Sequence, residues 1–227
     1  MRNPIPLPNG PMMNWLVLHS GPGEPAYNMA LDEALLEFIG DIGQPVLRFY
    51  EWTEPCATFG YSQKIADIES TTILRPLIRR CTGGGLVPHD GDWTYSLTFP
   101  PGHEWTSSSA TQSYRHTHAL LQKAFTAMGV KTELADCCQR PKPGECFEGF
   151  ELHDLLYHSK KIAGAAQRRN RFGLLIQGSV QPLGDWPLQD WLNALTGDCP
   201  KLEEPPGTRA EELTTTKYTL DSHNRKR

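Results

Sequence analysis

Alternating apolar and polar positions predict most of the strands in this chain. The clearest case runs from Trp93 to Phe99, where Trp, Tyr, Leu and Phe alternate with Thr, Ser and Thr. This period of two is typical of a strand in which one face is buried. A second alternating run predicts a strand at 46–52, and a short apolar run predicts a buried one at 15–19. Further strands are predicted at 55–61, 152–157, 161–167 and 174–180.

Apolar residues at helical spacing predict three helices. The predicted helices span 28–39, about 113–128 and 188–195. Asn28 is the expected N-cap of the first helix, because its side chain can accept a backbone N–H, and Gly40 is its expected end. On that helix we expect Asp32 and Glu33 to lie at the surface.

These elements indicate one α+β domain, a mixed sheet flanked by helices, over residues 14–199. The chain has 227 residues, which is enough for one large domain with a sizeable core. The proline-rich stretch 1–13 and the charged stretch 200–227 are expected to be flexible termini.

Composition excludes several classes of function. The net charge of -4 argues against general binding of nucleic acid, and no apolar run approaches the roughly 18 residues of a membrane span. The six cysteines are expected to be reduced thiols, because no export signal accompanies them. We therefore expect a cytoplasmic protein without a metal site, since the Cys and His spacings fit no standard pattern.

The first candidate site is a glycine cluster that follows two arginines. It reads Arg79, Arg80, Cys81, Thr82, Gly83, Gly84, Gly85 and continues to His89. Successive glycines let the backbone approach a ligand and expose its N–H groups, and arginines supply donors for anions. The alternative is a glycine-rich turn between strands with solvated arginines.

Two further candidates lie in the second half of the chain. Lys161 precedes small residues, among them Gly164 and Ala165, and could hold a carbonyl or phosphate oxygen in a cleft; a basic surface hairpin is the alternative. Cys146 could be a nucleophile if a cation lowers its pKa, or simply a small buried residue.

Taken together, these motifs resemble those of the lipoate and biotin protein ligase superfamily. The glycine segment followed by Thr94-Tyr95-Ser96 resembles its ligand-binding loop, and Lys161-Ile-Ala-Gly-Ala-Ala-Gln resembles its catalytic-lysine segment. Asn28-Met-Ala-Leu-Asp-Glu-Ala is similar to its first helix, and Phe59-Gly-Tyr-Ser-Gln to its substrate-side strand. The resemblance runs from about residue 16 to 182.

Two activities of that superfamily compete. Cys146, fifteen residues before Lys161, resembles the nucleophile of octanoyltransferases, which move octanoate from acyl carrier protein to a lysine of a lipoyl domain without a cofactor. Gly85 instead resembles the ATP-dependent lipoate–protein ligases, which would require ATP and Mg²⁺. A non-catalytic protein that binds lipoyl domains or carrier proteins is the alternative of another class.

The transferase interpretation implies a role for each motif residue. Cys146 and Lys161 would be catalytic, and His89 or a water would accept the proton of the acceptor lysine. The acceptors implied are the glycine cleavage H protein or a 2-oxoacid dehydrogenase E2. Neither nucleic acid nor a membrane is implied as a partner. The expected substrate-binding residues are Phe59, Tyr61, Arg79, Arg80, Thr82, Gly83, Gly84, Gly85, His89, Gly164 and Ala165. A basic rim that steers acidic partners is expected from Arg75, Arg79, Arg80, Lys160, Arg168, Arg169 and Arg171.

Overall fold

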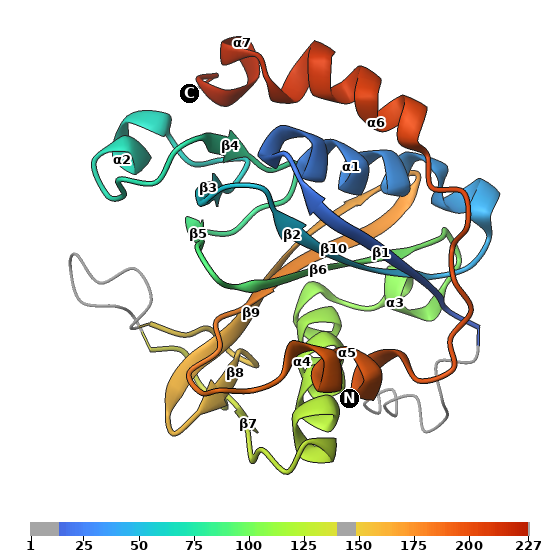
Figure 1. Cartoon of the computed structure of the whole chain (residues 1–227), viewed down its shortest axis with the longest axis vertical. Coiled ribbons are helices and arrows are strands. Elements are labelled where there is room, and N and C mark those ends of the chain that lie inside the picture. Colours follow the sequence, from blue (N-terminus) through green and yellow to red (C-terminus); the bar gives the residue numbers. More distant parts are fainter. Residues whose placement is uncertain (1–13, 140–148, 227) are drawn as a thin grey trace.

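The computed structural model describes residues 14–139 and 149–226, and a seven-stranded mixed sheet is its centre (Figure 1). The strand order is β1-β2-β6-β10-β9-β8-β7, with β1 parallel to β2 and the other neighbours antiparallel. The strands are β1 (Leu16–Gly23), β2 (Val46–Trp52), β6 (Trp93–Phe99), β7 (Glu133–Leu134), β8 (Leu155–Tyr157), β9 (Lys160–Asn170) and β10 (Gly173–Val180). A parallel neighbour requires a crossover, and α1 (Pro25–Ile42) supplies it.

A three-stranded sheet stands beside the large one and carries the glycine cluster. Its order is β4-β3-β5, formed by β3 (Cys56–Phe59), β4 (Leu77–Arg79) and β5 (Val87–His89). The short helix α2 (Ile65–Glu69) lies between β3 and β4 in the chain. The glycines follow β4 and precede β5, so both ends of their loop are fixed by strands.

Helices cover both faces of the large sheet. Figure 1 shows α1 on one face, and α4 (Ala110–Ala127) with α5 (Leu188–Thr196) on the other, next to the short α3 (Glu104–Ser107). The alternation in β6 explains the second layer, because Tyr95, Leu97 and Phe99 pack with Phe125 and Trp191 in one apolar core. The mixed-sheet fold and the bounds of β2 and β6 confirm the sequence-based predictions.

The start of α1 differs from the prediction. The helix begins at Pro25, which fits the first turn because that position needs no N–H donor. Asn28 is therefore inside the helix, where its amide donates to the carbonyls of Gly23 and Glu51 and its oxygen accepts from Arg48. The prediction that Asn28 caps the helix is wrong, because its hydrogen bonds go to the sheet.

The prediction of a flexible tail after Pro200 is also wrong for the residues up to 226. They form α6 (Gly207–Leu213), the π-helical turn η1 (Thr214–Tyr218) and α7 (Asp221–Asn224), which lie along the outer side of α1 (Figure 1). Tyr218 is fully buried and donates to Glu33 (2.7 Å), and Lys217 pairs with the same carboxylate (2.5 Å). These partners lie about 185 residues away in sequence, so local composition gives no sign of them.

Arg79 fastens the end of this tail to the glycine-bearing sheet. Its guanidinium is fully buried and donates to four backbone carbonyls, those of Tyr61, Gln63, His223 and Asn224, at 2.7–3.1 Å. A planar guanidinium has five donors and reaches all four of these carbonyls, whereas an ammonium has only three donors on one atom.

We predict that Arg79→Lys lowers the free energy of unfolding by about 2–3 kcal/mol, because buried carbonyls then lose their donors. Urea unfolding followed by circular dichroism measures the change. Arg75→Lys is the matched control, since Arg75 is exposed, and it should change stability by less than about 0.5 kcal/mol. Equal stability of the two variants would show that the carbonyl contacts do not matter.

Candidate active site

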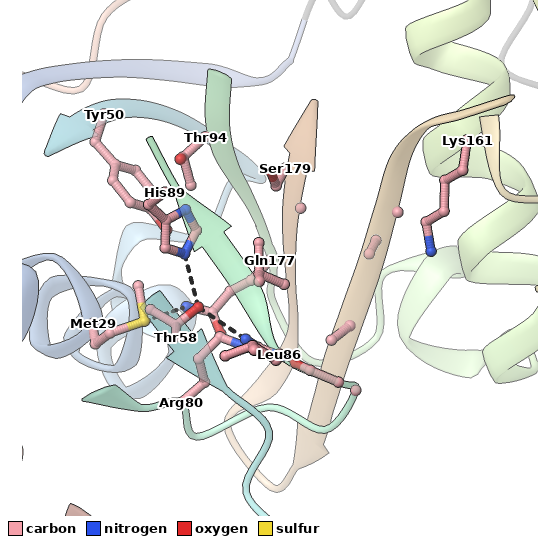
Figure 2. A pocket seen from close by; sticks show the side chains of 17 residues that line it. Met29, Tyr50, Thr58, Arg80, Leu86, His89, Thr94, Lys161, Gln177 and Ser179 are labelled. Atoms are coloured by element: carbon pink, nitrogen blue, oxygen red, sulfur yellow. Dashed lines mark hydrogen bonds between the residues drawn. The ribbon is translucent and has the colours of Figure 1, made fainter. Parts of the chain in front are cut away.

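A pocket lies between the glycine cluster and the strands β9 and β10 (Figure 2). Gly84, Gly85 and the start of β5 form one wall, and Gly164, Ala165 and Ala166 of β9 form another. Its polar lining residues are Tyr50, Thr58, Arg80, His89, Thr94, Lys161, Gln177 and Ser179. Small residues on β9 leave the backbone open to a ligand, as the sequence indicated.

The glycine loop is held from behind by Arg80 and Thr82. Arg80 donates to the carbonyls of Gly83 and Gly85 at 2.9 and 2.8 Å, and burial lowers the pKa of its guanidinium to about 10. The Thr82 hydroxyl donates to Gln177 of β10 (2.7 Å). The loop therefore has one set position relative to the large sheet.

Gly60 is required for this arrangement. A Cβ built on it would stand 2.0 Å from the carbonyl oxygen of Gly84, so the backbone just after β3 touches the backbone of the loop. Gly84 itself has a φ of +83°, a conformation that glycine adopts without strain.

Lys161 stands at the pocket wall and is paired with Asp154. Its Nζ lies 2.6 Å from Oδ2 of Asp154, which also accepts the backbone N–H of Glu151 (2.8 Å). A Cβ on Gly164 would lie only 2.7 Å from Cε and 2.8 Å from Nζ of Lys161. Gly164 thus makes the room in which the ammonium lies, which explains the glycine three residues after the lysine.

On the other side of the pocket, His89 is held in a chain of hydrogen bonds (Figure 2). Nδ1 lies 2.9 Å from Asp92 and Nε2 lies 2.8 Å from the Thr58 hydroxyl, which accepts from Arg80 (2.8 Å). Burial lowers the pKa of His89, which favours the neutral imidazole. Because Asp92 can only accept and Arg80 can only donate, Nδ1 carries the proton and Nε2 accepts from Thr58.

A second buried carboxylate, Asp32 of α1, lies under the pocket. It accepts from Arg48 (2.7 Å), Ser96 (2.6 Å), Tyr50 (3.0 Å) and Gln177 (2.7 Å). Asp32 is fully buried and Glu33 is 7% exposed, so the expectation that both lie at the surface is wrong. Both face partners on other elements, the sheet for Asp32 and the tail for Glu33.

The structure brings together part of the predicted binding set. Arg80, Gly84, Gly85, His89, Gly164 and Ala165 line the pocket with Lys161. Thr82 and Gly83 do not line it; Thr82 acts through Gln177. Cys146 lies outside the described residues.

Three predicted binding residues point elsewhere. Arg79 holds the tail, and Phe59 is buried with Ile68 and Leu77 in a separate apolar cluster. Tyr61 lies beside Arg168 and Lys226, away from the pocket lining. The predicted basic rim also loses Arg79 and Arg80, because both guanidiniums are buried.

Sequence reasoning missed Thr58, Asp92, Gln177 and Asp154 as parts of this site. The sequence shows only that Thr94, Ser96 and Thr98 alternate with the apolar residues of β6, and the burial of all three is seen in the structure alone. When a strand is buried on both faces, its polar face implies a hydrogen-bonded layer between the sheet and the helix. The partners of that layer come from distant segments and could not be assigned from sequence spacing.

Within the part of the chain that the structure describes, no helix is long and apolar enough to cross a membrane. The five cysteines in those ranges, Cys56, Cys81, Cys137, Cys138 and Cys199, are free thiols.

Comparison with known proteins agrees with this architecture. The curated octanoyltransferase LipM of Staphylococcus epidermidis is 34% identical over 180 residues, which cover 73% of this chain and 65% of the relative. LipM of Oceanobacillus iheyensis is 38% identical over 173 residues, 73% of this chain and 63% of the relative. The chain thus spans somewhat less than two thirds of the length of these relatives.

Solved structures share the fold. A putative lipoate protein ligase from T. acidophilum superposes with a TM-score of 0.73 at 21% identity, covering 94% of this chain and 99% of the other. A lipoate-protein ligase A bound with ATP gives 0.71 at 21% identity, with 93% and 98% covered. The family model for the lipoyl protein ligase A/B catalytic domain matches residues 24–193. On this match, and with the glycine loop and the lysine strand facing one pocket, the chain belongs to the lipoyl protein ligase A/B catalytic domain family.

Proposed function

We propose that the protein transfers an octanoyl group from acyl carrier protein to a lysine of a lipoyl domain, through a thioester on Cys146. The Cys146 thiolate attacks the octanoyl carbonyl, a new C–S bond forms, and the carrier's phosphopantetheine thiolate leaves and takes up a proton. The neutral amine of the acceptor lysine then attacks this thioester. The amide forms, the Cys146 thiolate leaves, and the amine proton passes to a base.

The placement of Lys161 is the observation that carries this proposal. Its ammonium stands at the wall of a pocket that the small residues Gly164, Ala165 and Ala166 also line, and it is paired with Asp154. A fixed cation beside a carbonyl site can stabilise both a thiolate and the oxyanion of a tetrahedral intermediate. The similarity to LipM octanoyltransferases supports octanoyl as the group transferred.

The pocket suits an acyl chain. Burying eight carbons at about 0.8 kcal/mol per CH₂ would supply about 5–6 kcal/mol before the costs of ordering. The backbone N–H groups of Gly84 and Gly85, which line the pocket, are candidates for contacts to the carbonyl oxygen. No cofactor is required by this route. We propose a cytoplasmic location for the protein, which the free thiols of the described residues support.

His89 is a poor direct acceptor for the proton of the acceptor lysine. Its Nε2 already accepts the Thr58 hydroxyl, and its Nδ1 is committed to Asp92. A water at the pocket mouth fits the role better. The acceptors we propose are the lipoyl-bearing H protein or E2 subunits, steered by the basic side chains of Lys160 and Arg171, which are exposed beside the pocket strands.

An ATP-dependent lipoate–protein ligase is the second candidate, favoured by Gly85. A Cβ built on Gly85 meets nothing within 4 Å, and its φ is not left-handed. The structure therefore does not require glycine there, so Gly85 reflects ligand chemistry or descent and not backbone strain. In a ligase, Lys161 would hold the carbonyl and phosphate oxygens of the adenylate, and Cys146 would have no covalent role.

We predict that mixing the protein with octanoyl–carrier protein, without ATP, gives one octanoyl adduct that hydroxylamine removes. Intact-mass spectrometry measures it, and Cys146→Ser should form none. Peptide mapping should leave Cys56 and Cys81 unmodified, because burial raises the pKa of both thiols to about 12. Labelling of a lipoyl domain only with lipoate and ATP would assign the protein to the ligases instead.

We also predict that Gly164→Ala folds normally but slows octanoyl transfer about 10- to 100-fold. The new methyl group displaces the end of the Lys161 side chain from Asp154, and a misplaced electrostatic group costs on this order. Single-turnover transfer and thermal unfolding measure the two effects. Gly40→Ala is the control, because a Cβ there meets nothing within 4 Å. An unchanged rate for Gly164→Ala would show that the position of Lys161 is not critical.

A further inference from the structure

Many side chains that line the pocket are polar, whereas the proposed acyl ligand is apolar. An octanoyl chain carries no hydrogen-bonding group beyond its carbonyl, yet many side chains around the pocket are polar. Polar groups that lose water without gaining a partner would oppose binding of such a chain. Whether these side chains oppose binding depends on where their hydrogen atoms point.

For five of the polar side chains that line the pocket, they end on two buried carboxylates. The Tyr50 hydroxyl and the Gln177 amide donate to Asp32. His89, Thr94 and Ser179 donate to Oδ2 of Asp92 at 2.9, 3.0 and 2.6 Å. The side chains of Asp32 and Asp92 are both fully buried.

The direction of each proton around Asp92 is fixed. The Trp52 indole N–H, which can only donate, donates to the Thr94 hydroxyl (2.8 Å), so the Thr94 proton must point at Asp92. Trp52 also stacks on the His89 ring, with centroids 4.1 Å apart. The Ser179 hydroxyl accepts from Gln181 (3.0 Å), so its proton also points to Asp92.

We propose that Asp92 is a specificity-determining residue that withdraws the donors of His89, Thr94 and Ser179 from the pocket. The part of the wall formed by His89, Thr94 and Ser179 is thereby made of polar residues whose donors point away from the pocket, and it selects an uncharged acyl chain without polar groups. Asp32 does the same for Tyr50 and Gln177, and it additionally holds the Arg48 guanidinium. This inference rests on the proposed acyl transfer and adds to it the origin of chain selection.

The location of Asp92 makes its effect separable from catalysis. It does not line the pocket, and Lys161 lies apart from His89 and Ser179 in Figure 2. Removing Asp92 leaves three donors without an acceptor around the pocket, which then favours water or a polar ligand. Asp92→Asn keeps an amide oxygen at the position of Oδ2, and its NH₂ replaces Oδ1, which accepts no hydrogen bond from the described residues.

The test compares octanoyl with 8-hydroxyoctanoyl, both delivered on acyl carrier protein. An apolar pocket rejects an added hydroxyl by about 100-fold, so the wild type should prefer octanoyl by up to that factor in kcat/KM for acylation. Asp92→Ala should reduce the preference at least about tenfold, mainly through a higher KM for octanoyl. Asp92→Asn should restore most of it. An unchanged preference in Asp92→Ala would overturn the inference.

The controls separate folding and the proposed function from this inference. Asp41→Asn, an exposed carboxylate on α1, should leave the preference unchanged, and thermal unfolding reports whether each variant folds. If Asp92→Ala does not fold, Ser179→Ala is measured instead. This variant removes a donor that is already satisfied by Asp92, so the octanoyl preference should persist. A loss of the preference would mean that Ser179 contacts substrate directly, which contradicts the inference.

If the wild type forms no acyl adduct, the proposed transfer is wrong, and the selectivity is then measured by calorimetric binding of octanamide against 8-hydroxyoctanamide. A preference for octanamide that Asp92→Ala abolishes would still support the inference. Equal binding of both amides to the wild type would contradict it.

Discussion

A carboxylate in the middle of α1 connects the helix, the sheet and the pocket. Asp32 accepts four hydrogen bonds, from Arg48 of β2, Ser96 of β6, Gln177 of β10 and Tyr50 of β2. Removing one partner of a buried ion pair strands the other charge at a cost of about 3–5 kcal/mol. The position of α1 on the sheet, and through Gln177 and Thr82 the position of the glycine loop, therefore depends on this one side chain.

Consecutive residues of the glycine segment serve different parts of the molecule. β4 ends at Arg79, whose guanidinium joins the C-terminal helices, and the next side chain, Arg80, supports the glycine loop and Thr58. Neighbouring residues in extended backbone point to opposite sides, so one short sequence can hold two structures. The two arginines look like one anion site in the sequence, but each has its own structural role. Both guanidiniums donate to backbone carbonyls, so neither is free to bind an anionic ligand.

Sequence periodicity predicted the parts of this fold that depend on one chain segment at a time. The strand at Trp93–Phe99 was predictable because alternation is a local property. That the glycine segment and Lys161 share one site was implied by the resemblance to the ligase superfamily and not by periodicity or spacing. The tail was not predictable, because Tyr218 and Lys217 gain their partners on α1 and a charged stretch with few apolar residues resembles a solvated one. For the same reason Asp92 was not identified: its role comes from donors on β5, β6 and β10.

The glycines of the site illustrate the limit of motif reasoning. Gly60, Gly164 and Gly85 all belong to recognisable motifs, but only the first two are required by space. Gly60 allows backbone contact with Gly84, and Gly164 leaves room for the Lys161 side chain, whereas a side chain at Gly85 would meet open space. A motif therefore combines positions fixed by packing with positions that are free to follow the ligand, and only the structure separates them. The fixed glycines set the places of the loop and of the lysine. A side chain can therefore alter ligand contacts without moving either one only at the open positions and in the hydrogen-bonded layer beneath the pocket.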